Sequence, residues 1–118
     1  MPDTAPTGTE PLGPVFRALA DPTRRAVIER LEEGPASVRT LAQPFDMALP
    51  SFTQHLRVLE DAGLIRSVKH GRTRTVRLAP DGIRPAETWL ARRREAWERR
   101  LDRLDAYAIE AAREEETR

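Results

Sequence analysis

Residues 49–63 read LPSFTQHLRVLEDAG, and this stretch decides the fold that the sequence predicts. Its large apolar side chains recur at the spacing of one helix face: Phe52, Leu56 and Leu59. Gly63 follows them as the glycine that commonly ends a helix does. The stretch therefore predicts an amphipathic helix over residues 49–62, anchored to a core by its apolar face.

The opposite face of this helix is polar. It carries short hydroxyl, amide and guanidinium side chains: Ser51, Thr53, Gln54 and Arg57. Groups of these kinds hydrogen-bond the edges of bases and the phosphates of DNA. Most surface helices of globular proteins also have one polar face, so the neighbouring segments must decide between a solvated surface and DNA reading.

Three shorter helices are expected before this one, at residues 14–20, 22–33 and 38–45. Asp21, followed by proline, is a strong helix start, and Ser37 can cap the third helix. Pro44 should shorten the last turn of that helix because it lacks a backbone donor. A short connection at residues 46–48 then gives residues 38–63 the outline of a helix-turn-helix.

A β-hairpin with a basic tip is predicted at residues 65–79. Residues 73–78 are rich in β-branched side chains, and Gly71 can form the turn. Five cations and no acid lie between residues 66 and 77: Arg66, Lys69, Arg72, Arg74 and Arg77. A basic strip beside a reading helix suits phosphate binding, although a solvated hairpin is the alternative.

Residues 86–116 contain nothing that breaks a helix. Apolar side chains form a heptad-like seam with flanking aromatic residues: Trp89, Leu90, Trp97, Leu101, Leu104 and Ala108. So long a helix cannot pack fully on so small a body. We therefore expect it to pack in part against a second subunit.

Composition limits the classes of protein that fit. The chain has 118 residues and no cysteine, which indicates one domain over residues 12–116 and excludes thiolate metal sites. Residues 1–11 contain three prolines among small polar residues and predict a flexible tail. No run of about 18 apolar residues predicts a membrane span, and a cytoplasmic location is expected. The predicted fold class is mainly α with a small β-hairpin.

The segment LAQPFDMALPSFTQHLRVLEDAGLI, residues 41–65, resembles the helix-turn-helix signature of the ArsR/SmtB-type winged-helix transcriptional regulators. Residues 18–25, ALADPTRR, resemble the start of that family's second helix. The resemblance implies a winged helix-turn-helix with four helices, two strands and a fifth helix. It also implies a homodimer joined through the first and last helices, with Val15, Phe16 and Leu19 in the interface.

The resemblance further implies a repressor that reads double-stranded DNA through its recognition helix. The implied base-facing residues are Leu49, Ser51, Thr53 and Gln54. The implied contacts from the helix and wing to the DNA backbone are Arg57, His55, Lys69, Arg72 and Arg74.

The metal-sensing members of the family use cysteines before the turn or Asp/His pairs on the last helix. Neither set is present here, so no metal and no cofactor are expected, and an organic effector or a protein partner would supply any signal. Catalysis is not expected, because no nucleophile elbow, phosphate loop or paired carboxylate is found. The alternative function is a winged-helix module that binds a protein or senses a small ligand without specific DNA readout.

Overall fold

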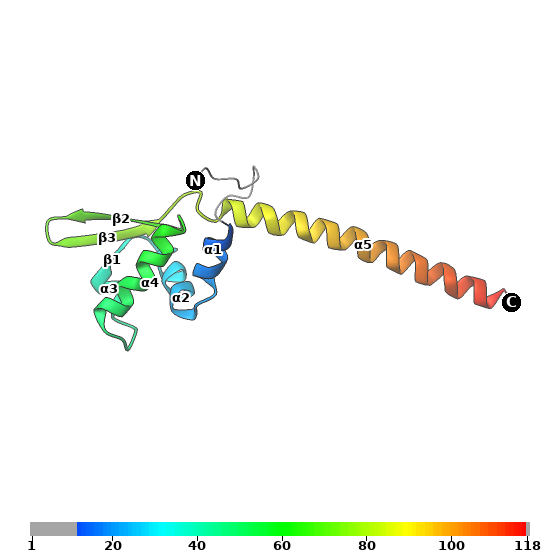
Figure 1. Cartoon of the computed structure of the whole chain (residues 1–118), viewed down its shortest axis with the longest axis horizontal. Coiled ribbons are helices and arrows are strands. Elements are labelled where there is room, and N and C mark those ends of the chain that lie inside the picture. The colour runs from blue at the N-terminus through cyan, green and yellow to red at the C-terminus, as the bar shows by residue number, and fades with distance from the viewer. Residues whose placement is uncertain (1–11, 118) are drawn as a thin grey trace, which may run out of the picture. The chain divides into compact units, whose positions relative to one another are not determined.

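The computed structural model describes residues 12–117, so the tail predicted at residues 1–11 lies outside the described residues. The described chain divides into two compact units, one ending at Ala86 and one beginning at Glu87. Each unit is described by itself below. Figure 1 labels the helices and strands.

The first unit is mainly helical with a small antiparallel sheet. Its elements in chain order are α1 (Leu12–Leu19), α2 (Pro22–Leu31), β1 (Ala36–Ser37), α3 (Val38–Ala42), α4 (Leu49–Asp61), β2 (Ile65–His70) and β3 (Thr73–Leu78). The last helix, α5 (Arg84–Glu116), begins in the first unit and makes up most of the second. This order confirms the predicted fold class and the winged helix-turn-helix.

Local sequence signals set the helix boundaries. The Asp21 carboxylate accepts a hydrogen bond from the Arg24 backbone N–H at 3.1 Å, so it caps α2. Ser37 caps α3 in the same way, accepting from the Thr40 backbone N–H at 3.1 Å. The third helix ends at Ala42, earlier than the predicted residue 45, because Pro44 cannot donate within a further turn.

The sheet has one strand more than the sequence predicts. Strands β2 and β3 form the expected hairpin, and Gly71 in its turn has a φ of +61°, a conformation that favours glycine. The additional strand β1 pairs antiparallel with β3, which gives the strand order β1-β3-β2. Two residues are too few to show the alternation that reveals a strand in a sequence.

The helix α4 lies at the centre of the first unit, in contact with α1, α2, α3 and β2. Phe52 and Leu59 are fully buried on its inner face, and Leu56 is nearly so. The Phe52 ring stacks on Phe45 with 5.4 Å between the ring centroids. Each such side chain contributes about 1.5–3 kcal/mol by leaving water, so α4 is held rigidly with its polar face outward.

Candidate nucleic-acid interface

The outer face of α4 is open to solvent. Five predicted contact residues on this face are exposed: Leu49, Ser51, Thr53, Gln54 and Arg57. Leu49, an apolar residue, has 55% of its surface exposed at the first position of the helix. The structure therefore presents these side chains together on one rigid helix.

The start of α4 has no side-chain cap. Ala48 occupies the N-cap position, and its methyl side chain cannot accept a hydrogen bond from the first-turn N–H groups. The Thr53 hydroxyl donates to the Pro50 carbonyl at 3.0 Å. Because that bond uses the only hydroxyl proton, Thr53 faces a ligand as an acceptor.

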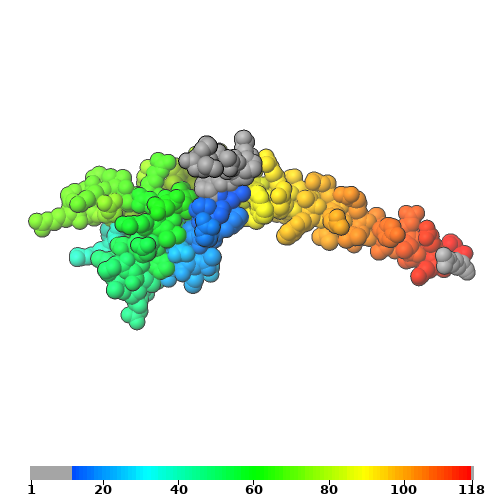
Figure 2. Space-filling model, in the orientation of Figure 1, coloured from blue at the N-terminus to red at the C-terminus, as the bar shows by residue number. Residues whose placement is uncertain are grey.

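The hairpin of β2 and β3 projects from the first unit, and Figure 2 shows its tip extending past the helices. Lys69 and Arg72 are exposed near this tip. Arg74 is held differently, because its Nη1 donates to Ser67 Oγ at 3.0 Å. Ser67 Oγ in turn lies 3.3 Å from both carboxylate oxygens of Glu60 on α4 and donates to them. Of the three predicted wing cations, Arg74 is thus tied to the recognition helix.

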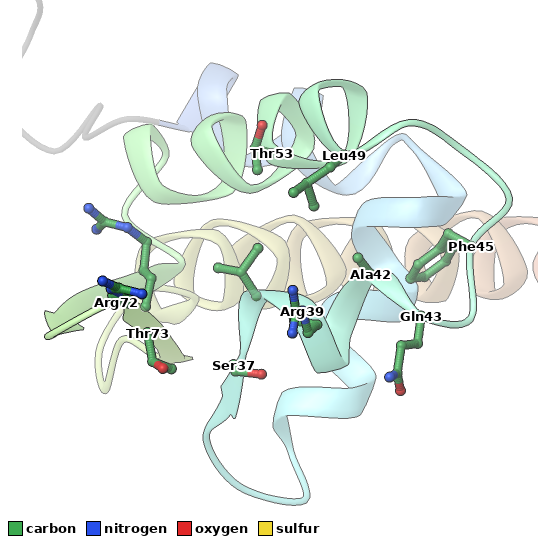
Figure 3. A pocket seen from close by; sticks show the side chains of 11 residues that line it. Ser37, Arg39, Ala42, Gln43, Phe45, Leu49, Thr53, Arg72 and Thr73 are labelled. Carbon is green, nitrogen blue, oxygen red and sulfur yellow. The ribbon is translucent and has the colours of Figure 1, made fainter.

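A groove of about 980 Å³ lies between α3, the first turns of α4 and the hairpin. Figure 3 shows Leu49 and Thr53 on one side, Arg39 on α3, and Arg72 with Thr73 at the hairpin. Arg39 is absent from the sequence-predicted contacts. Its position in the sequence carries no signal, because only the folded chain brings α3 and the hairpin to one groove.

His55, predicted as a backbone contact, is only partly accessible. Its Nδ1 lies 3.0 Å from Nη1 of Arg24 and 3.8 Å from a carboxylate oxygen of Asp21. An arginine N–H can only donate, so Nδ1 accepts this bond and the neutral ring carries its proton on Nε2. The inward-facing nitrogen is therefore committed to α2, and only the other edge of the ring can face a ligand.

Within residues 12–117, Asp21 is the one titratable side chain whose pKa departs clearly from its ordinary value. Burial acts to raise the pKa of its carboxyl, but the hydrogen bond from the Arg24 backbone N–H and the electrostatic attraction of His55 and Arg24 outweigh that effect. The pKa of Asp21 consequently lies below the ordinary value of 3.8.

The predicted interface residues of α1 differ in how far they are exposed. Val15 has no exposed surface and packs in the core of its own unit, so it has no surface to offer a second subunit. Its place in the predicted interface is corrected accordingly, since a stripe of adjacent apolar residues does not reveal which of them faces the core. Phe16 is 38% exposed and Leu19 is partly buried.

The second unit exposes the predicted seam. Within α5 the exposed large apolar residues include Trp89, Leu90, Trp97, Leu101 and Leu104, and Ala108 is exposed with them. The Arg93 guanidinium lies over the Trp89 ring at 5.0 Å from its centroid, a cation–π contact. An exposed apolar seam of this length is typical of a surface that another helix covers.

Two kinds of site are not found in the part of the chain that the structure describes. Residues 12–117 contain no cluster of three or more His, Cys, Asp or Glu side chains that could hold a metal ion. Among the same residues, no helix is both long and apolar enough to cross a bilayer.

Comparison with known proteins agrees with this geometry. A helix-turn-helix domain family matches residues 19–68. The HTH-type transcriptional regulator Rv2034 of Mycobacterium tuberculosis is 42% identical over 77 residues, which cover 65% of this chain and 72% of that protein. The transcriptional repressor SdpR of Bacillus subtilis is 35% identical over 57 residues, covering 48% of this chain and 63% of the repressor. A crystal structure of an ArsR family transcriptional regulator superposes with a TM-score of 0.72 at 55% identity, covering 75% of this chain and 92% of that one.

Proposed function

Because the chain belongs to the ArsR family of winged helix-turn-helix transcriptional regulators, we propose that it binds operator DNA as a homodimer in the cytoplasm and represses transcription. The observation that carries the proposal is the outer face of α4. It offers an apolar group, a hydroxyl acceptor, an amide and a guanidinium on a helix whose inner face is buried. A rigid helix of this kind fits the major groove.

The proposed roles follow from side-chain chemistry. Gln54 can bond an adenine through both the carbonyl oxygen and the NH2 of its amide, and Leu49 can contact a thymine methyl group. Ser51 and Thr53 can accept from base amino groups. Arg57, Lys69, Arg72 and Arg74 supply charge for phosphates. His55 can offer only its outer ring edge to the DNA backbone.

The dimer is proposed to form through the exposed seam of α5 together with Phe16 and Leu19 of α1. A dimer places two α4 helices on two half-sites, spaced about one helical turn of DNA apart. Release from DNA would then depend on an organic effector or a protein partner, since the chain contains no cysteine and its described residues form no metal cluster.

The proposal is tested by footprinting and gel shift with DNA from upstream of the gene that encodes this chain. We expect a protected site with two related halves, and a specific complex that persists at higher salt than the complex with random duplex. Equal binding to both duplexes would refute specific readout. The absence of any complex at low salt would instead favour the alternative, a winged-helix module that binds a protein or a small ligand.

A further inference from the structure

The groove between α3, α4 and the hairpin carries an unusual charge. Among its lining residues are three arginines and no acid: Arg39, Arg72 and Arg74. They come from three different elements, namely α3, the hairpin turn and β3. The sequence places the first more than thirty residues from the others, so only the fold gathers the three charges.

The three arginines differ in their hydrogen-bond partners within the protein. Arg74 donates to Ser67, whose hydroxyl donates to the Glu60 carboxylate, so a protein anion lies close to its charge. Within residues 12–117, neither the Arg39 nor the Arg72 side chain makes a hydrogen bond or an ion pair with a protein atom. Both are exposed. The groove therefore presents two guanidinium groups whose charge the protein does not neutralise.

Arg39 and Arg72 also differ in rigidity. Arg72 lies in the turn of a projecting hairpin, whereas Arg39 lies on α3, which is anchored by the buried Leu41 and capped by Ser37. Figure 3 shows the Arg39 side chain within the groove, across from Leu49 and Thr53 of α4. A DNA strand whose bases meet the first turns of α4 would carry its phosphates past this guanidinium.

We propose that Arg39 contacts a DNA phosphate, as a fixed anchor on the helix before the recognition helix. The proposal rests on the proposed function. Guanidinium groups bind phosphates in a fork geometry and release condensed counterions when they do so. A phosphate contact carries no sequence information, so Arg39 sets the position of α4 on the duplex without selecting bases.

The test is the salt dependence of binding for Arg39→Ala, on the footprinted duplex and on a random duplex of equal length. We expect the slope of log K against log salt to become shallower by about 0.9 for each phosphate that the variant no longer neutralises, hence about 1.8 for a dimer. The change in slope should be the same on both duplexes. Arg39→Lys, which keeps the charge, should retain most of the slope, and thermal melting checks that each variant is folded.

Arg113→Ala is the matched control, because it removes the same charge from an exposed residue that lies outside both the groove lining and the basic strip of residues 66–77. An unchanged slope in Arg39→Ala, or an equal change in Arg113→Ala, would overturn the anchor while the wild-type complex still supports the proposed function. Weaker binding of Arg39→Ala confined to the specific duplex would also overturn it, since that pattern indicates base reading. Failure of the wild-type protein to bind the specific duplex would refute the proposed function itself.

Discussion

Arg24 donates from Nη1 to Nδ1 of His55 over 3.0 Å, and this bond joins α2 to the middle of the recognition helix. The same guanidinium donates to the carbonyls of Ala18 at 2.8 Å and Arg17 at 3.1 Å, near the end of α1. One side chain therefore ties α1, which holds part of the proposed dimer interface, to α4, which holds the proposed DNA contacts.

Arg24→Ala should lower the free energy of unfolding by about 1.5–3 kcal/mol, because partly buried acceptors are left without a charged donor. Arg24→Lys should recover little of the lost stability, since an ammonium group cannot reach the three acceptors that the planar guanidinium bonds at once. Urea denaturation at a fixed protein concentration measures both variants. Wild-type stability in Arg24→Lys would contradict this prediction, because it would show that a single positive charge at this position stabilises the fold as well as the guanidinium does.

Asp21 predicts a dependence of stability on pH. Its folded-state pKa lies below its unfolded value, so its ionised form stabilises the folded chain fully above the ordinary value of 3.8. That contribution is lost as pH falls through the folded-state pKa. Asp21→Asn keeps an N-cap acceptor but removes the charge.

The advantage in stability of wild type over Asp21→Asn should therefore be constant near neutral pH and shrink below about pH 4. Denaturation of both proteins from about pH 7 to about pH 2.5 measures this difference, and other carboxylates cancel in the comparison. A difference that does not change with pH would contradict the role of the charge.

Gly82 predicts a steric cost. A Cβ atom at this position would lie 2.4 Å from the Gly63 carbonyl oxygen, a backbone atom that cannot rotate away. Gly82→Ala should therefore destabilise the fold by about 1–3 kcal/mol, measured by the shift in the urea midpoint.

Gly63 provides the comparison, because its φ is +80° but a Cβ there would meet nothing within 4 Å. Gly63→Ala should cost about 1–2 kcal/mol from backbone strain alone, and asparagine should cost less than alanine at this site. Gly82→Ser should destabilise the fold at least as much as Gly82→Ala, because it adds the same Cβ atom. Wild-type stability of Gly82→Ala would show that the backbone around residue 82 can move away from the Gly63 carbonyl.

The sequence could predict those parts of the fold that local patterns specify. The apolar spacing of residues 49–62 and the proline and cap residues before it depend only on neighbours within a few turns, and the structure confirms α4 and the hairpin. The pairing of β1 with β3 joins Ala36 to Val76, and no local pattern encodes so distant a contact.

The candidate site was predictable to the same extent. Exposed polar positions on α4 follow from its period, so Gln54 and Arg57 could be selected. The groove could not, because it depends on how α3 and the hairpin pack, so the position of Arg39 in its lining could not be predicted. Val15 was assigned to the wrong surface for the same reason, since only packing decides which face of α1 is internal.

Gln54→Ala should weaken binding to the operator by about 1–3 kcal/mol while leaving binding to random duplex nearly unchanged. The reason is that an amide that bonds one base contributes only where that base is present. Titration of both duplexes at one salt concentration measures the two changes in affinity. Equal changes would contradict base reading by Gln54.

The exposed seam of α5 predicts the assembly state. Leu101 is 58% exposed and Leu104 is 56% exposed in the single chain, and both lie on the seam. We expect the wild-type protein to sediment as a dimer at micromolar concentration. The double variant of Leu101→Glu with Leu104→Glu should sediment as a monomer, because two carboxylates would be buried without partners at the interface.

Ala106→Glu is the matched control, since it adds a carboxylate to the opposite side of the same helix and should remain a dimer. The double variant should also show weaker helical circular dichroism, because an exposed helix has little stability without packing. Its operator affinity should fall far more than its affinity for random duplex, since only a dimer binds both half-sites at once. A monomeric wild-type protein, or a dimeric double variant, would contradict an interface on this seam.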